Sequence, residues 1–282
     1  MVEVAEKETR KISDLIRERF AEPSNIGIDR LSIGTHATQL EHRSHRRFKN
    51  TTITEETLQL LYACALSAPS KSDLQQTAII HLEEPVARDF IQRSIPSMPW
   101  ISSAPVFLLF CGDSRRIRDI CEFHNTSFAH DPLDALVNAV ADTAIVLQNF
   151  IIAAEAEGLG CCPVSAVREI TESLSEFCAL PDSVFPFAGL CLGYAEDAPP
   201  ISVRLPARVV VHKNRYDASS LADEIAEYDR RRQKKNSYKN QRQADRYGLL
   251  EDYGWSLDKA RQTSNTDRIS FSSYVRKHGF KL

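Results

Sequence analysis

Apolar residues follow two patterns along the chain, and these predict helices in some segments and strands in others. Apolar positions recur every three or four residues in the stretches that predict helices, which are 1–20, 55–68, 135–158 and 272–282. Continuous apolar runs predict strands at 77–82, 104–113, 185–195 and 208–216. The order has no regular βαβ rhythm, so the pattern favours an α+β fold with helices around one central sheet.

The stretch 135–158 gives the strongest helical signal. Its apolar face is so broad that we expect a helix buried nearly all round, in a core or a subunit interface, ending at Gly158 and Gly160. Asn138 and Asp142 interrupt the run, which argues against a membrane span. Thr54 precedes the predicted helix 55–68 as an N-cap.

Composition describes an ordinary globular protein. The 282 residues are 43% hydrophobic and 26% charged, with a formal net charge of −3, which weighs against a nucleic-acid binder. No secretory signal opens the chain, so we expect a cytoplasmic protein. Seven cysteines sit mostly in apolar runs and fit buried, reduced thiols. The pair Cys161 and Cys162 lacks any CxxC or ordered His spacing, so packing is favoured over metal binding or redox chemistry.

Four short segments carry polar chemistry. The segment 42–48 reads HRSHRRF, in which guanidinium groups could bind a phosphate, or simply form a solvated basic loop. Residues 68–75, APSKSDLQ, could bind a polar ligand or only end a helix. Residues 158–165 include small residues that let backbone amides approach a ligand closely, and Arg204 follows the strand predicted at 185–195. No Ser/His/Asp or HExxH signature is present, and the glycine cluster GLGCCP follows a helix, which excludes a dinucleotide-binding fingerprint.

Taken together, these segments resemble the nitroreductase-like FMN flavoproteins, in particular their NADPH-dependent nitro/flavin reductase branch. The resemblance covers residues 41–216 and rests on EHRSHRRF, SAPSKSDLQ, ADTAIVLQNFIIAAEAEGLG with CCPVSAVR, and LPDSVFPFAGLCLGYAEDAPPISVRLPARVVVHKNRY, in that order. It implies a nitroreductase-like sandwich, with a central, mostly antiparallel sheet flanked by helices. It also implies a homodimer that binds FMN at the subunit interface.

The resemblance also implies a role for each matching residue. His42, Arg43, Ser44 and Arg204 fall on the positions that hold the ribityl phosphate. Arg46 falls where a cation lies near flavin N1 and O2 and raises the two-electron potential. The loop that contacts the pyrimidine edge and ribityl chain matches Ser70, Lys71 and Gln75. The backbone N–H groups that face flavin N5 and O4 match the segment of Pro163, Val164, Ser165 and Ala166.

The implied activity is ping-pong hydride transfer from NADPH or NADH, through FMN, to a nitroaromatic, quinone or flavin acceptor. No side chain is expected to act as a catalytic acid or nucleophile. Basic residues 230–235 could hold the 2′-phosphate of NADPH or form a solvated helix face. The chain would then comprise an N-terminal extension (1–35), an FMN-binding nitroreductase-like domain (36–216) and a basic C-terminal extension (217–282) that packs on the dimer.

The chain departs from the branch at three places, which keeps other functions open. Ser202 stands where a Lys is usual, CCPVSA replaces a glycine-rich segment, and residues 97–99 replace a stretch that tends to carry a Gln. A non-catalytic flavin or ligand binder with the same fold is the main alternative. A nucleic-acid or anion binder built on the basic runs comes third, because of the net charge.

Overall fold

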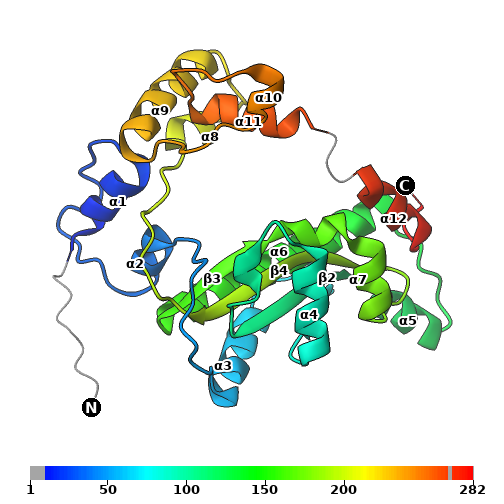
Figure 1. The fold of residues 1–282 in the computed structure, drawn as a ribbon. Helices are drawn as coiled ribbons and strands as arrows, with labels where there is room; N and C mark the ends of the chain where they lie inside the picture. Colours follow the sequence, from blue (N-terminus) through cyan, green and yellow to red (C-terminus); the bar gives the residue numbers. More distant parts are fainter. Residues whose placement is uncertain (1–9, 266–268, 282) are drawn as a thin grey trace. The chain divides into compact units, whose positions relative to one another are not determined.

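The computed structural model describes residues 10–265 and 269–281, and the chain divides into two compact units. We call residues 1–43 and 200–267 the helical unit, and residues 44–199 and 268–282 the sheet unit. The chain leaves the sheet unit after residue 199 and returns to it at 268 (Figure 1). The division of the chain into three parts at residues 35 and 216 stays a prediction.

One four-stranded sheet forms the centre of the sheet unit in the described part of the chain. Its strands are β1 (Thr77–His81), β2 (Val106–Asp113), β3 (Leu159–Val164) and β4 (Val184–Tyr194). Every pairing is antiparallel, and the strand order is β1-β2-β4-β3. This confirms the predicted α+β class and the three strands predicted at 77–82, 104–113 and 185–195. The pattern missed β3, because GLGCCP is short and lacks a long apolar run.

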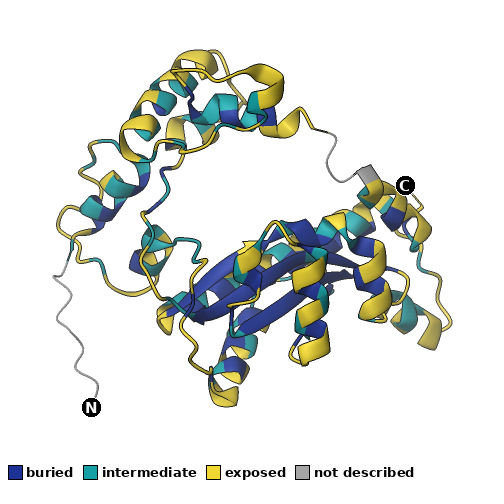
Figure 2. Cartoon of the chain, viewed as in Figure 1, coloured by how far each residue is buried: buried dark blue, intermediate teal, exposed yellow. Residues whose placement is uncertain are grey.

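Helices cover both faces of this sheet, and the alternation of side chains along each strand divides the core in two. Leu108, Phe110 and Leu190 point to the face covered by α3 (Glu55–Leu66) and α6 (Pro132–Ala156). Phe107 and Cys191 point to the other face, which α4 (Pro85–Ser94) and α7 (Thr171–Phe177) cover. Figure 2 shows β2, β3 and β4 largely dark blue, whereas the outward sides of α3 and α4 are yellow.

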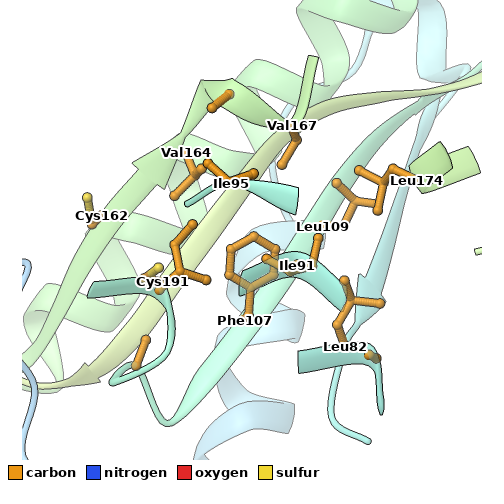
Figure 3. Close-up of a cluster of buried hydrophobic side chains, with 14 of the residues drawn as sticks. Leu82, Ile91, Ile95, Phe107, Leu109, Cys162, Val164, Val167, Leu174 and Cys191 are labelled. Atoms are coloured by element: carbon orange, nitrogen blue, oxygen red, sulfur yellow. The ribbon is translucent and has the colours of Figure 1, made fainter. Parts of the chain in front are cut away.

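Figure 3 shows the second of these clusters, in which the ring of Phe107 lies among Ile91, Leu109 and Cys191. A Cβ on Gly189 would lie 2.4 Å from the tip of the Phe107 ring, so the neighbouring strand needs glycine at that position. At this point of the core, a bulky ring packs directly against bare backbone.

The helix predicted at 135–158 is α6, and it begins earlier than the pattern indicated. Asp131 caps its first turn by accepting hydrogen bonds from the N–H groups of Leu133 and Asp134, and Pro132 occupies the first position. Within the chain the helix is not buried all round, because Leu133 (57%), Val137 (53%) and Ile145 (39%) are exposed. Its length and apolar composition would suffice to cross a membrane, but half of its most apolar stretch is buried in the protein, as in a core helix.

Other predicted elements have mixed outcomes. Thr54 caps α3 by accepting a hydrogen bond from the N–H of Thr57, as predicted. The helix predicted at 272–282 is α12 (Ile269–Lys277), which packs Tyr274 and Val275 beside α6. The strand predicted at 208–216 is wrong: a single helical turn, α8 (Ala207–Val210), lies there, with Val210 exposed. Pro206 directly precedes that turn, and a helix readily accepts proline at its start.

The remaining elements of the helical unit are short helices. They are α1 (Ile12–Phe20), α2 (Gly34–Glu41), α9 (Leu221–Lys235), α10 (Ala244–Tyr247) and α11 (Trp255–Thr263). The helix predicted at 1–20 is α1 where the structure describes it, and residues 1–9 lie outside the described residues. Tyr228 of α9 donates a hydrogen bond to the carbonyl of Val203 and packs edge-on against Trp255 of α11. The sheet unit also contains α5 (Arg115–Phe123).

Candidate functional site

The HRSHRRF segment begins in the helical unit and continues along the edge of the sheet. Ser44 pairs with Cys161 in a parallel bridge, and the N–H of His45 donates to the carbonyl of Cys161 at 2.9 Å. The His45 ring lies so close to Gly160 that a Cβ there would be 2.8 Å from the ring. One small residue of the GLGCC segment therefore makes room for a histidine of this chain. The same contact places Arg46 next to β3.

Arg46 lies beside a group of aromatic and sulfur atoms in the sheet unit. Its guanidinium carbon is 5.4 Å from the centre of the Trp100 ring, and the side chain is exposed. Burial raises the pKa of the nearby Cys162 thiol, and the positive charge of Arg46 opposes that rise. Trp100 did not enter the sequence prediction, although it directly follows residues 97–99. Its indole gives Arg46 a fixed surface to lie against.

The segment 163–166 ends β3 and begins a short 3-10 helix, Ser165–Glu169. Pro163 is exposed, whereas Val164 and Ala166 belong to the buried cluster of Figure 3. Proline has no N–H, so the donors predicted from this segment are limited to Val164, Ser165 and Ala166. Pro163 fits an edge strand, where it removes no hydrogen bond from the middle of the sheet.

The loop of Ser70, Lys71 and Gln75 is held by a carboxylate that the sequence prediction missed. Asp142, buried on α6, accepts hydrogen bonds from the Ser70 hydroxyl (2.8 Å), the Lys71 N–H (2.9 Å) and the Gln76 N–H (3.0 Å). The Ser70 oxygen also accepts a hydrogen bond from the Gln75 N–H at 2.7 Å. Ser70 therefore closes the loop, while the side chains of Lys71 and Gln75 are exposed. An acid on the apolar part of this helix was the signal for this role.

The backbone of this loop is strained at three positions. Ser72, Asp73 and Gln75 have φ values of 50°, 57° and 51°, in the left-handed region that non-glycine residues rarely adopt. Such conformations persist where surrounding contacts fix them, and they gather at functional sites. The three bonds to Asp142 help to fix this loop, as does the hydrogen bond that Arg116 donates to the carbonyl of Gln75.

The two predicted ligand segments of the sheet unit lie at opposite edges of the sheet. The 70–76 loop leads into β1 at one edge, whereas residues 163–166 end β3 at the other. Three strand spacings separate these edges, roughly 14 Å. Both faces between them are covered by helices and filled with buried side chains. Within one chain the structure does not bring these segments together.

The helical unit holds the other predicted ligands, namely His42, Arg43 and Arg204. The carbonyls of His42 and Ser202 both accept hydrogen bonds from Arg19 of α1, so the two segments are tied together. The Nε of Arg43 is buried and lacks a hydrogen-bond partner among the described residues. Arg204 is exposed and lines a cavity of about 450 Å³ with Tyr228 and Arg232.

These groups fit the phosphate of a flavin nucleotide. An unpaired guanidinium N–H and a second, exposed guanidinium supply the donors that an anionic phosphate requires. Within residues 10–265 and 269–281, no group of three or more His, Cys, Asp or Glu side chains gathers in a way that could hold a metal ion.

The basic residues at 230–235 are largely engaged within the helical unit. Arg231 pairs with Glu22, Arg232 donates to the carbonyl of Val203, and Lys235 donates to the carbonyl of Glu18. Arg230 pairs with Glu227 one turn earlier on the same helix. Most of this run thus holds α9 to its neighbours.

The vicinal cysteines pack as the sequence predicted. Cys161 belongs to the cluster on one face of the sheet and Cys162 to the cluster on the other. All seven cysteines, which lie within the described residues, are free thiols, and burial raises the pKa of Cys161 well above its usual value. Such a thiol is a poor nucleophile at neutral pH.

Comparison with known proteins identifies the family to which this fold and site belong. The nitroreductase family model matches residues 40–194, and the model of its C-terminal domain matches residues 202–282. The first match alone spans more than half of the chain, so the chain belongs to the nitroreductase family. Both matches begin after α1, which lies in the segment before residue 40.

Particular relatives agree with this assignment. The chain is similar to an oxygen-insensitive NADPH nitroreductase of Salmonella typhimurium, 35% identical over 193 residues, covering 66% of this chain and 79% of that protein. It is also similar to an FMN reductase (NAD(P)H) of Bacillus subtilis, 31% identical, covering 86% and 96%. The structure of the NADPH:FMN oxidoreductase of Vibrio harveyi complexed with NAD⁺ matches with a TM-score of 0.76 and 29% identity, over 87% of this chain and 97% of that one. The predicted nitroreductase-like fold is confirmed.

Proposed function

We infer the activity from the family and the site together: the chain is an FMN-dependent oxidoreductase that takes electrons from NAD(P)H. Its relatives include an NADPH nitroreductase, an NADPH-flavin oxidoreductase and FMN reductases. The observation that carries the inference in this chain is the pair of arginines in the helical unit. Arg43 has a buried donor without a partner among the described residues. Arg204 lies two residues after Ser202, and hydrogen bonds from Arg19 connect Ser202 to His42. Together Arg43 and Arg204 suit the phosphate of FMN.

Bound FMN supplies the centre that accepts a hydride from NAD(P)H and passes it on to a nitroaromatic, quinone or flavin acceptor. The chain contributes position and charge. Arg46 provides a positive charge at the pyrimidine end of the ring system, held in place by Trp100. The N–H groups of Val164, Ser165 and Ala166 provide donors for the ring edge where the hydride arrives. Lys71 and Gln75 present exposed polar groups to the pyrimidine and ribityl atoms.

The active form we propose is a homodimer with a flavin site at the subunit interface. One chain presents Lys71 and Gln75 at the β1 edge of its sheet and residues 163–166 at the β3 edge, with buried cores between them. A single flavin reaches both segments if a second copy supplies one of them. The exposed apolar stripe of Leu133, Val137 and Ile145 on α6 gives the two copies a surface to bury against each other.

We place this enzyme in the cytoplasm, where seven free thiols remain reduced. NADPH is the donor we favour over NADH. Among the described residues, the other four arginine and lysine side chains of 230–235 have hydrogen bonds or ion pairs within the unit, so Lys234 is the residue of this run that we assign to the 2′-phosphate of NADPH.

Replacement of Arg204 tests the phosphate role. We expect Arg204→Ala to lose FMN, because it removes an exposed guanidinium from the proposed phosphate site, and a charged hydrogen bond of this kind contributes about 1.5–3 kcal/mol. The absorbance of flavin that remains bound after gel filtration measures the loss. Arg215→Ala is the matched control, because Arg215 is another exposed arginine of the same unit. Full flavin retention in Arg204→Ala would remove Arg204 from the site.

Replacement of Arg46 tests the charge at the ring system. Arg46→Ala should lower the two-electron potential of the bound flavin and slow its reduction by NADPH, because a nearby positive charge favours the reduced, anionic form. Redox titration and stopped-flow reduction give the two values. Arg47→Ala controls for loss of a neighbouring exposed charge that pairs with Glu196. An unchanged potential in Arg46→Ala would show that the cation lies elsewhere.

A further inference from the structure

Arg19 is a buried cation whose partners join two distant segments of the helical unit. Only 5% of the residue is exposed. Its Nε and one terminal nitrogen donate to the carbonyl of Leu40 at 3.1 and 2.7 Å, and the other terminal nitrogen donates to the carbonyl of Ser202 at 3.0 Å. The carbonyl of His42 accepts a further bond from the same side chain. One guanidinium therefore holds residues 40–42 against residue 202.

The backbone of Arg19 completes this connection. Its carbonyl accepts a hydrogen bond from the N–H of Arg204 at 2.9 Å. Arg19 thus contacts the backbone of two of the four predicted phosphate ligands, His42 and Arg204, and a third, Arg43, directly follows His42. A buried guanidinium needs its N–H groups hydrogen-bonded, and its planar fork fixes the directions of those bonds. The relative position of the two segments depends on this side chain.

Helix α1, which carries Arg19, is itself held in place by contacts within the helical unit. Leu15 is fully buried, and the carbonyl of Glu18 accepts a hydrogen bond from Lys235 of α9. Just after the helix, Glu22 pairs with Arg208 of α8 and with Arg231 of α9. The segment that carries Arg19 is therefore an integral part of the helical unit, although it lies outside the matches to the family models.

We propose that Arg19 is a positioning residue for the FMN phosphate, an inference that rests on the proposed function. It sets the distance between residues 42–43 and the segment of Arg204, so that His42, Arg43 and Arg204 converge on one phosphate group. It also adds a buried positive charge next to that phosphate. Arg19 acts through these neighbours and does not itself contact the ring system. Its loss should therefore weaken recognition of the phosphate and leave recognition of the rest of the flavin unchanged.

The experiment compares FMN with riboflavin, which has the same ring system and ribityl chain but no phosphate. Full-length protein freed of flavin is titrated with each, and flavin fluorescence gives the two dissociation constants. For Arg19→Met we expect the FMN constant to rise roughly tenfold to hundredfold. The riboflavin constant should stay within about twofold. A role in folding alone would raise both constants together, so the ratio separates positioning from general destabilisation.

Two further variants sharpen the result. Arg17→Met removes an arginine two residues away on the same helix, and it should leave the ratio unchanged. Among the described residues, the hydrogen bonds of Arg17 reach Asp14, Ser24 and Asn25. Arg19→Lys keeps the charge but lacks the fork that reaches several carbonyls, and it should lower the preference for FMN by a smaller factor. If Arg19→Met does not fold, as judged by circular dichroism, Arg19→Lys decides the question. A lysine variant with the wild-type ratio would overturn the proposal.

The outcomes also separate this proposal from the proposed function. If the wild-type protein binds FMN more tightly than riboflavin but Arg19→Met shifts both constants equally, or neither, the positioning role is wrong and the flavin function stands. If the wild-type protein binds the two flavins equally well, the phosphate site itself is wrong. If it binds neither, the proposed function fails.

Discussion

Different kinds of contact stabilise the interior of the sheet unit and the interior of the helical unit. In the sheet unit, helices pack against apolar side chains of the strands, such as Phe107 on one face of the sheet and Leu190 on the other. In the helical unit, the long-range connections are mainly polar: Arg19 to carbonyls, Glu22 to two arginines, and Tyr228 to the carbonyl of Val203. Apolar burial depends on area, whereas polar contacts require particular partners in particular directions. The two units should therefore respond differently to mutation, pH and salt.

The largest effect is expected in the core of the sheet unit. Phe107→Ala should lower the free energy of unfolding by about 3–5 kcal/mol, because a fully buried ring leaves a cavity beside Gly189. Urea unfolding monitored by circular dichroism gives the value. Val86→Ala, at an exposed position on α4, should change it by less than about 0.5 kcal/mol. A similar small change for Phe107→Ala would contradict an apolar core at this place.

A polar contact inside the apolar unit should have a smaller effect. Asp142→Asn should lower stability by about 1–3 kcal/mol, because the amide cannot accept all three hydrogen bonds from the 70–76 loop. It should also weaken flavin binding, since Lys71 and Gln75 lose their support. Asp134→Asn, at an exposed position of the same helix, should change stability by less than about 1 kcal/mol. Equal effects of the two substitutions would show that Asp142 does not organise the loop.

The smallest effect is expected at an ion pair of the helical unit. Hydrogen bonding from Arg208, opposed by partial burial and aided by the charge of Arg231, lowers the pKa of Glu22 below its usual value. The carboxylate therefore contributes stability above the pKa of the unfolded chain, about 4.3, and this contribution is lost as the pH falls through the lower folded value. Glu22→Gln should cost about 0.5–1 kcal/mol at pH 7 and nothing at strongly acidic pH.

Amide hydrogen exchange in α1 measures this change locally. Exchange should be faster in Glu22→Gln at pH 7, and the difference from the wild type should shrink in high salt, which screens such pairs. Glu251→Gln, at an exposed position without an ion pair among the described residues, should leave α1 unchanged. A salt-independent difference would argue against an electrostatic contact.

The contrast between an apolar core and polar contacts also explains how far the sequence could predict the structure. Long apolar runs predicted β1, β2, β4 and the position of α6, because burial on a sheet leaves a strong pattern. The strand predicted at 208–216 was wrong: the valines of this run are apolar, but Val210 and Val211 remain exposed after Pro206. Nothing local in GLGCCP distinguishes β3, whose strand conformation depends on pairing with β4 and with Ser44.

The candidate site likewise contains residues that the sequence could single out and residues that it could not. The basic segment 42–46 and Arg204 could be singled out from residue type, and the structure ties their backbones together through Arg19. Asp142, Trp100 and Arg19 could not be assigned, since each acts through a partner far away in sequence. Asp142 contacts a loop more than sixty residues earlier, and Arg19 contacts Ser202. The roles of the individual flavin ligands stay predictions that flavin-binding measurements on variants would test.

The visible absorption spectrum of the purified protein tests the central claim most directly. We predict the bands of an oxidised flavin, release of FMN on denaturation, and bleaching of the bands when NADPH is added without oxygen. A colourless protein that also fails to take up added FMN would contradict the account, and Arg43, Arg46 and Arg204 would lose the roles given to them here.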